Sequence, residues 1–322
     1  MQVVAVDIGG THARFAIAEV ESGRVRSLGD PVTLKTAEHA SLQTAWQHFA
    51  AMQDGPLPRA TGIAVASPIG GDVIKLTNNP WIIRPALINE RLGVDRWTLV
   101  NDFGAVGHAV AQVPDGDFIH LCGPDRPLPD HGMLTVCGPG TGLGVAGVFR
   151  HDGGYHVVET EGGHIDFAPL DRIEDAILQH LRKTYTRVSA ERICSGPGIV
   201  AIYETLAAIE GRAVARLDDK AIWSKALDGS DSLAVAALDR FCLALGAVAG
   251  DLALTHGPRG VVIAGGLGLR LKGHLLRSGF EERFVAKGRF RNLMASIPVK
   301  LITHPQPGLF GAAAAYAQEH TQ

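Results

Sequence analysis

Three short glycine-rich segments are the first candidates for chemistry in this 322-residue chain: Gly9-Gly10, the Gly-Thr-Gly-Leu-Gly run at 140–144, and Gly265-Gly266. A backbone N–H reaches a phosphate oxygen only where side chains do not block the approach, and adjacent glycines allow several N–H groups to point inward. A single loop of this kind is better explained as a turn that needs glycine for steric reasons. Three loops together, with Asp7 beside the first, favour a site for nucleotide phosphates.

The hydrophobic pattern predicts the elements that hold these loops. Apolar runs predict strands at residues 3–7, 14–19, 62–66, 97–100, 133–137, 145–149, 260–264 and 299–303. Helical spacing and helix-start signals predict helices at residues 41–52, 85–92, 173–184, 197–209, 232–254 and 309–319, with a further helix after Asn101-Asp102. The first two loops each join two predicted strands, and the third opens a helix. This repeated strand–loop–strand unit predicts two similar lobes.

Composition limits the possible partners. The chain is 46% hydrophobic, enough for a large core and, at this length, most naturally for two lobes. Its formal net charge is −3 and its 30 Lys and Arg residues are scattered, so no basic surface is predicted. We therefore expect neither nucleic acid nor a membrane as a partner.

The four cysteines give no sign of a redox or metal site. They are too far apart for a CxxC pair, and free cysteines commonly behave as small buried apolar residues. The sequence has no signal-peptide pattern, and we expect no apolar run long enough to span a bilayer. These features predict a cytoplasmic protein with reduced thiols.

Two common nucleotide folds do not fit the glycine pattern. There is no GxxxxGK[ST] motif, and the glycines at 9–10 and 140–144 lie between strands instead of opening a helix. The segments 7–11 and 140–144 resemble the phosphate loops of the actin, sugar kinase and heat-shock chaperone ATPase superfamily. Within it, the chain resembles the bacterial glucokinase family over nearly its whole length. The motifs that carry this resemblance are Asp7-Ile8-Gly9-Gly10-Thr11, Asn101-Asp102-Phe103, Glu161-Gly162-Gly163-His164-Ile165-Asp166-Phe167, Ser189-Ala190-Glu191-Arg192, Ser195-Gly196-Pro197-Gly198, Ala264-Gly265-Gly266 and Pro307-Gly308-Leu309-Phe310-Gly311.

The resemblance implies an α/β fold of two ribonuclease-H-like, or actin-like ATPase, lobes with mixed sheets flanked by helices and a cleft between them. The smaller lobe would be residues 1–110 plus 301–322, with the first phosphate loop and the catalytic aspartate. The larger lobe would be residues 111–300, with the second phosphate loop and the sugar and adenosine sites. A homodimer through the larger lobe is also implied. The implied reaction, an entry step of glycolysis, transfers the γ-phosphoryl group of Mg²⁺-bound ATP to the 6-hydroxyl of glucose.

The resemblance also assigns roles at matching positions. Asp102 is the implied catalytic base, which accepts the proton of the 6-hydroxyl. The residues implied to bind the sugar are Asn101, Asp102, Gly142, Glu161, His164 and Glu191, a mixture of polar groups that suits a ring of hydroxyls. Those implied to bind ATP are Asp7, Ile8, Gly9, Gly10, Thr11, Gly140, Thr141, Gly142, Gly265 and Gly266. Asp7 would also orient Mg²⁺, directly or through water.

Each charged candidate has a structural explanation as well. Asn101 and Asp102 are good N-caps for a helix that begins at Phe103. Glu161 and His164 fit a turn at a strand end, with the imidazole bonded to a backbone carbonyl, and Glu191 fits a solvated helix start. Only their joint occurrence with the phosphate loops favours function.

The sequence departs from related patterns in informative places. His12 follows Gly-Gly-Thr where the family commonly has Asn, so its contact is expected to change or be lost. No cysteine lies between His164 and Cys194, which removes the CxC cluster of the zinc-containing kinase and repressor branch, and we expect no zinc. That branch's repressors carry an N-terminal helix-turn-helix, whereas the first strand here is predicted from residue 3.

Two other functions compete with glucose phosphorylation. A kinase for fructose, mannose or an N-acetylhexosamine needs only one exchanged contact to the sugar. A non-enzymatic ATPase switch, as in chaperones or filaments, has no need for Glu161, His164 and Glu191, and is disfavoured.

Overall fold

The structure, a computed structural model, describes residues 1–76 and 79–321. The chain divides into two compact units. Unit 1 comprises Met1–Pro114, Val157–Glu159 and His304–Gln322, and unit 2 comprises Asp115–His156 and Thr160–Thr303. Residue 322, the last of unit 1 and of the predicted smaller lobe, lies outside the described residues.

Unit 1 is built on a six-stranded mixed sheet with the strand order β3-β2-β1-β5-β8, in which β4 also pairs with β2. β1 runs antiparallel to β2 and parallel to β5, and β5 runs parallel to β8. The carboxyl ends of β1, β5 and β8 therefore lie at one edge of the sheet. The elements of unit 1 are β1 (Gln2–Ile8), β2 (His12–Glu21), β3 (Arg24–Leu28), β4 (Val32–Lys35), η1 (Thr36–Glu38), α1 (Leu42–Ala51), β5 (Ala60–Val65), β6 (Ile74–Lys75), β7 (Ile82–Ile83), η2 (Pro85–Leu87), α2 (Ile88–Leu92), β8 (Arg96–Asn101), α3 (Asp102–Gln112) and α12 (Pro307–His320).

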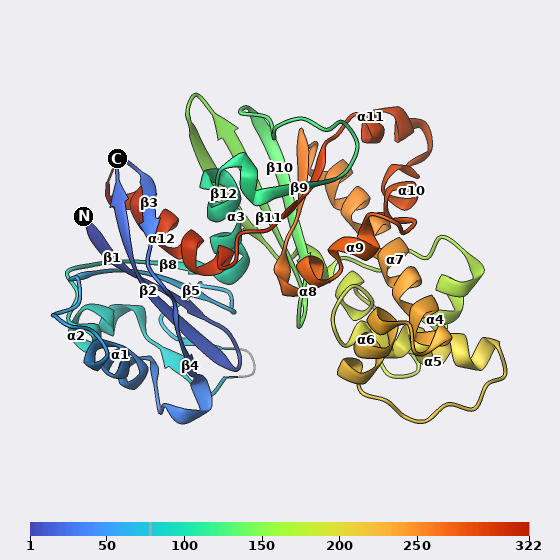
Figure 1. Ribbon diagram of the computed structural model, residues 1–322, viewed down its shortest axis with the longest axis horizontal. Coiled ribbons are helices and arrows are strands. Elements are labelled where there is room, and N and C mark those ends of the chain that lie inside the picture. Colours follow the sequence, from blue (N-terminus) through green and yellow to red (C-terminus); the bar gives the residue numbers. More distant parts are fainter. Residues whose placement is uncertain (77–78, 322) are drawn as a thin grey trace. The chain divides into compact units, whose positions relative to one another are not determined.

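The central strands of unit 1 are mostly apolar because helices cover both faces of the sheet. Alternate side chains of a strand point to opposite faces. Val4 and Val6 belong to the cluster that contains Trp46 of α1, whereas Val3 and Ala5 belong to the cluster that contains Tyr316 of α12. Figure 1 shows α1 and α2 on one side of this sheet and α12 on the other.

Small residues let α12 approach its neighbours closely. A Cβ at Gly62 of β5 would overlap the carbonyl of Ala312, and a Cβ at Gly311 would overlap that of Ala105 in α3. Glycine removes both clashes. This packing holds α3 and β5 against α12. The predicted site residues Asn101 and Asp102 lie at the end of β8 and the start of α3.

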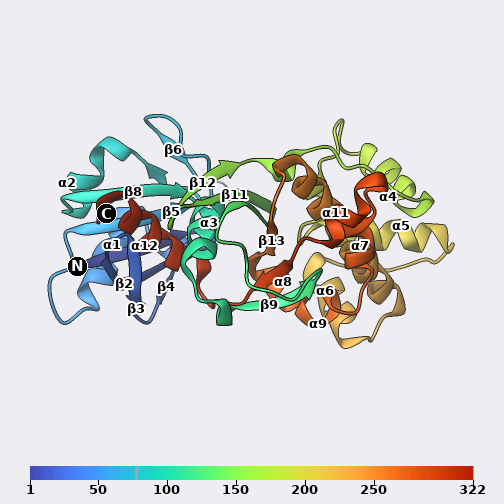
Figure 2. The same cartoon turned by 90° about the horizontal axis from the view of Figure 1, so that it is seen from above.

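Unit 2 repeats the arrangement with the strand order β12-β11-β10-β13-β14-β9. β10 is antiparallel to β11 and parallel to β13, β13 is parallel to β14, and β9 is antiparallel to β14. Figure 2 shows the helices α4, α5 and α7 gathered beside this sheet. The elements of unit 2 are η3 (Asp115–Asp117), β9 (Phe118–Cys122), β10 (Gly132–Pro139), β11 (Leu143–His151), β12 (Gly154–Thr160), η4 (Gly162–His164), α4 (Arg172–Arg182), η5 (Ala190–Arg192), α5 (Gly198–Ile209), α6 (Asp219–Asp228), α7 (Ser232–His256), β13 (Gly260–Ile263), α8 (Gly265–Arg270), α9 (Lys272–Leu275), α10 (Phe280–Val285), η6 (Gly288–Phe290), α11 (Arg291–Ala295) and β14 (Val299–Ile302). Of β12, the residues Val157–Glu159 belong to unit 1.

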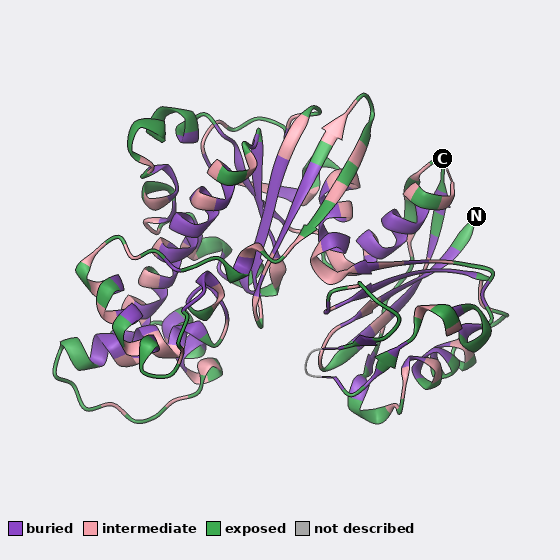
Figure 3. Cartoon of the chain, turned by 180° about the vertical axis from the view of Figure 1, so that it is seen from behind, coloured by how far each residue is buried: buried purple, intermediate pink, exposed green. Residues whose placement is uncertain are grey.

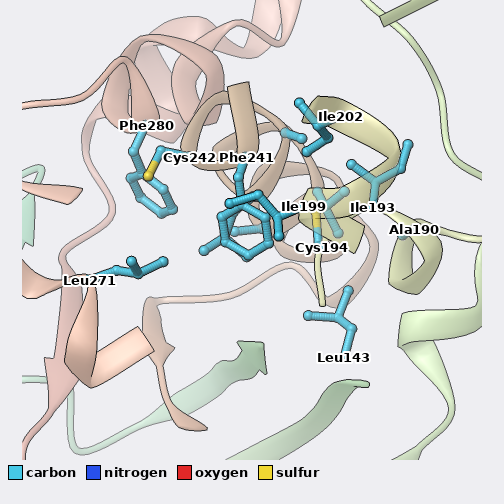
Figure 4. Packing of buried hydrophobic residues seen from close by; sticks show 14 of the residues in the cluster. Leu143, Ala190, Ile193, Cys194, Ile199, Ile202, Phe241, Cys242, Leu271 and Phe280 are labelled. Carbon is cyan, nitrogen blue, oxygen red and sulfur yellow. The ribbon is translucent and has the colours of Figure 1, made fainter. Parts of the chain in front are cut away.

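The centre of unit 2 is the 25-residue helix α7. Its side chains Phe241 and Cys242 are fully buried with Ile199 of α5 and Phe280 of α10, as Figure 4 shows. The expectation that no apolar run is long enough to span a bilayer is wrong, because α7 is both long enough and apolar enough to do so. However, 72% of its most apolar window is buried inside the protein, which identifies α7 as a core helix.

The predicted strands and long helices are present with small shifts at their ends, and Figure 3 shows the buried central strands of each sheet. The helix predicted at 85–92 is a 3₁₀ turn, η2, followed by the short helix α2. The helix predicted from Phe103 begins one residue earlier, at Asp102. The strands β3, β4, β6, β7, β9 and β12 were not predicted. β3 and β12 lie at sheet ends and have no buried side chain, and β4, β6 and β7 are only two to four residues long.

Candidate active site

The loop at 9–11 joins β1 to β2 and has its carbonyl groups bonded to the protein. Asn79 Nδ2 donates to Gly9 O at 3.2 Å, Thr36 Oγ1 donates to Gly10 O at 2.9 Å, and Thr36 N donates to Thr11 O at 3.0 Å. The backbone N–H groups of Gly10 and Thr11 have no acceptor among the described residues. A loop with its carbonyls tied back and its N–H groups unbonded is suited to phosphate oxygens.

His12 faces its neighbour in this loop. One of its ring nitrogens, Nδ1, lies 2.9 Å from the hydroxyl of Thr11, so the two side chains share a hydrogen bond. The His12 imidazole therefore engages the Thr11 hydroxyl in a hydrogen bond.

Asp7 lies near the carboxyl end of β1, opposite Arg14 in the register with β2. Arg14 Nη1 donates to Asp7 Oδ2 at 3.1 Å. Burial raises the pKa of the Asp7 carboxyl, and the charge and hydrogen bond of Arg14 oppose this shift. Asp7 also packs against the start of α12, since a Cβ on Gly308 would lie 3.1 Å from its carboxylate. A largely buried carboxylate beside a phosphate loop fits a group that orients a hard cation.

Asn101 and Asp102 stand where β8 ends and α3 begins. Asn101 is the N-cap, and its Oδ1 accepts hydrogen bonds from the N–H groups of Phe103 at 2.9 Å and Gly104 at 3.3 Å. Its Nδ2 donates to Ser67 O at 3.3 Å. Asp102 is the first residue of α3 and accepts from Phe103 N through Oδ1 at 2.9 Å. The capping explanation is therefore correct for Asn101, and this cap fixes the backbone that carries the Asp102 carboxylate.

The second loop, between β10 and β11, is held by a neighbouring motif and by Glu191. Gly140 N donates to Gly142 O at 2.8 Å, and Gly196 N donates to Gly140 O at 2.7 Å. Glu191 Oε2 accepts from Leu143 N at 3.0 Å and would overlap a Cβ on Gly142. Glu191 is thus no solvated helix-start residue, because its carboxylate lies at the second loop.

Glu161 and His164 lie together on the short turn η4. His164 N donates to Glu161 O at 2.9 Å, and the imidazole Nε2 lies 3.9 Å from Glu161 Oε2. The side chains of Glu161 and His164 are 63% and 54% exposed, so both are available to a ligand. A Cβ on Gly163 would overlap Leu143 O, and a Cβ on Gly162 would lie 2.9 Å from Val145 Cγ1, which explains the glycine pair between them.

Leu143 therefore brings the predicted sugar-binding residues of unit 2 to one place. Its N–H bonds Glu191, its carbonyl packs on Gly163, and Gly142 precedes it in the chain. The segments of η4 and η5 are also joined directly, since Ala190 N donates to Ile165 O at 2.8 Å.

The third glycine loop lies beside the second. Gly265 has a φ of +82°, and a Cβ there would meet Pro139 O at 2.6 Å. Ala264 N donates to Cys137 O at 2.9 Å, which aligns the end of β13 with the end of β10. Gly266 is exposed.

Comparisons with known proteins show the family to which the chain belongs. A family model described as Glucokinase matches residues 4–319. The chain belongs to the glucokinase family. It is 62% identical over 322 residues to a glucokinase from Zymomonas mobilis subsp. mobilis, covering 100% of this chain and 99% of the relative.

Solved glucokinases have the same fold. The glucokinase of an Antarctic psychrotroph aligns with a TM-score of 0.85 at 32% identity, covering 98% of each chain. The glucokinase of Balamuthia mandrillaris, in complex with glucose, aligns with a TM-score of 0.77 over 99% of this chain and 93% of that protein. Its identity of 22% supports the fold alone.

These comparisons confirm the predicted glucokinase family, the α/β class with two mixed sheets flanked by helices, and the enzyme class, an ATP-dependent hexose phosphotransferase. The individual site residues stay predictions. Thr36 and Asn79, which hold the first loop, were not predicted as site residues, because they are distant in sequence from the glycines they contact. Ser67 directly follows a predicted strand, and Gly196 belongs to a quoted motif, so a signal existed for both.

Proposed function

We propose that this chain transfers the γ-phosphoryl group of ATP to the 6-hydroxyl of glucose, giving glucose 6-phosphate and ADP. The single observation that carries this proposal is the 62% identity to the Zymomonas glucokinase over the whole chain. In the reaction a bond forms between the sugar oxygen and the γ-phosphorus, the bond to the β-phosphate oxygen breaks, and the hydroxyl proton leaves to a base.

Asp102 is the proposed base. Its backbone is fixed by the Asn101 cap, so its carboxylate has a defined direction at the first turn of α3. An ordinary carboxylate is basic enough, because a loose transition state delays the proton transfer until late. The main contribution of the protein is then to hold the hydroxyl in line with the phosphate.

Glucose recognition is assigned to Asn101, Gly142, Glu161, His164 and Glu191. The exposed pair Glu161 and His164 supplies an acceptor and an imidazole nitrogen at 3.9 Å from each other. Such groups bond hydroxyls that both donate and accept. The absence of a side chain at Gly142 lets the Glu191 carboxylate lie against the second loop, where the sugar would be bound.

ATP binding is assigned to Asp7, Ile8, Gly9, Gly10 and Thr11 in unit 1 and to Gly140, Thr141, Gly142, Gly265 and Gly266 in unit 2. Mg²⁺, when bound, neutralises charge on the transferring phosphoryl group. No group of three or more His, Cys, Asp or Glu side chains suited to a metal occurs among the described residues. The residues of the site therefore suit a metal ion that is held mainly by the nucleotide and water and is oriented by Asp7. Varying Mg²⁺ at fixed ATP tests this dependence.

The proposal extends to the predicted lobes, the compartment and the assembly. The lobe of residues 1–110 and 301–322 would supply the first loop and the base, and residues 111–300 the sugar and adenosine sites. We further propose a cytoplasmic homodimer. Sedimentation equilibrium at several concentrations tests the dimer, and a monomer at all of them would contradict it.

The variant Asp102→Asn tests the catalytic assignment. An amide cannot take the proton, so kcat should fall by about 100-fold or more while glucose binding is retained. Steady-state kinetics give kcat, and calorimetric titration gives the glucose affinity. A variant with near-normal kcat would show that another group is the base.

A further inference from the structure

Glu159 is a carboxylate outside the predicted site that contacts the start of α3. The segment Val157–Glu159 belongs to unit 1, although the residues on both sides of it belong to unit 2. Glu159 Oε1 accepts a hydrogen bond from the backbone N–H of Asn101 at 2.8 Å. The bonded residue directly precedes the proposed base.

Gly104 provides the space for this carboxylate. The three atoms nearest to a Cβ built at Gly104 all belong to Glu159, namely Oε1, Cγ at 2.8 Å and Cδ at 2.9 Å. Gly104 is absent from the glycines with a positive φ, so the backbone does not require glycine there. The Glu159 side chain is what an alanine at this position would displace.

With Glu159 in place, Asn101 is held on three sides. Its Oδ1 accepts from two N–H groups of α3, its Nδ2 donates to Ser67 O, and its own N–H donates to Glu159. The carboxylate also lies by the amino end of α3, where a negative charge is stabilised by the helix dipole. Loss of Glu159 would free the backbone of the residue that leads into Asp102.

We propose that Glu159 is a positioning residue for phosphoryl transfer, which holds Asn101 so that the Asp102 carboxylate keeps its direction. This inference rests on the proposed role of Asp102. Glu159 needs no contact with either substrate to act in this way, and displacement of a catalytic group by about 1 Å can reduce the rate by about 100-fold.

Kinetics of Glu159→Ala and Glu159→Gln test the proposal. Glu159→Ala should lower kcat by about tenfold or more with the KM for ATP changed by less than about twofold. Glu159→Gln keeps a side-chain oxygen that can accept from Asn101 N–H, so it should recover most of the kcat. The matched control is Val158→Ala, an exposed neighbour on the same segment, which should behave as wild type. A Glu159→Ala enzyme with normal kcat would overturn the inference.

A double-mutant cycle with Gly104→Ala tests the contact without relying on activity. In the wild-type background the new Cβ collides with Glu159, so Tm should fall. In the Glu159→Ala background the collision is gone, and Tm should rise because alanine favours a helix over glycine. An equal fall of Tm in both backgrounds would contradict the contact.

Asp102→Asn, measured in parallel, separates this inference from the proposed function. An inactive Asp102→Asn with a normal Glu159→Ala would overturn the positioning role alone. An active Asp102→Asn would overturn the role of Asp102, and the positioning role with it.

Discussion

Asp7 is a largely buried carboxylate, 17% exposed, with the guanidinium of Arg14 beside it. Burial raises its pKa more than Arg14, at 3.1 Å, lowers it. A carboxyl group whose pKa is raised by folding stabilises the fold fully below its ordinary pKa of about 4, and this stabilisation is lost as the pH rises through the raised value. Near neutral pH the ionised Asp7 therefore costs stability, which fits a residue retained for its charge.

The variant Asp7→Asn should accordingly be more stable and less active. Near pH 7 its Tm should rise by about 2 °C, because the amide needs no ionisation and Arg14 is exposed enough to be solvated. The gain should shrink as the pH falls through the raised pKa. Scanning calorimetry at several pH values measures this, with the exposed Asp30→Asn as control. A lower Tm near neutral pH would show that the Arg14 ion pair outweighs the burial cost.

For single residues, the sequence indicated candidate site residues better than it indicated the contacts that these residues make. Asn101 was expected either as an N-cap or as a site residue, and its amide oxygen does cap α3. The support from Glu159 was not predictable, because it joins residues 58 positions apart. Glu191 was expected as either solvated or functional, and only the fold places its carboxylate at Leu143.

The turn η4 is the element on which sugar recognition depends. Gly163 packs directly on the backbone of Leu143, with its would-be Cβ 3.1 Å from Leu143 Cβ and closer still to the Leu143 carbonyl. The turn can therefore approach β11 only without a side chain at this position. The distance between η4 and β11 sets where Glu161 and His164 lie.

The variant Gly163→Ala should push η4 away from β11. The KM for glucose should rise by about tenfold, since the contacts to several hydroxyls are misplaced, while the KM for ATP should change little. Steady-state kinetics with each substrate varied measure both constants. Gly273→Ala is the matched control, because a Cβ there meets no atom within 4 Å. Equal increases in both KM values would point to general disruption instead.

Elements buried on both sides were predictable from sequence. β1 and β10 read as continuous apolar runs, and α7 as a long apolar helix, because other elements cover them. The short helices α9 to α11 were missed, since four to six residues carry too little periodicity to distinguish a helix from a loop. The ten-residue helix α6 was also missed, because its buried stripe consists only of Ile222, Trp223 and Ala226. The glycine loops of the site were predicted in spite of these missed elements, because the loops lie at the ends of well-predicted strands.

For the whole molecule, the order of motifs was more informative than any one of them. Two glycine loops that each join two strands predicted two similar lobes, and both units contain a six-stranded sheet. The glucokinase family match over residues 4–319 agrees with motifs that run from Asp7 to Gly311. The preference among hexoses was not predictable, because one altered contact can exchange a hydroxyl for an acetamido group.

Turnover of a panel of sugars tests the central claim most directly. ADP release is followed with Mg²⁺-ATP and with glucose, fructose, mannose or N-acetylglucosamine as the acceptor, and without sugar. We expect the highest kcat/KM with glucose and little ADP release without a sugar. Robust turnover of N-acetylglucosamine without turnover of glucose would contradict the proposed substrate.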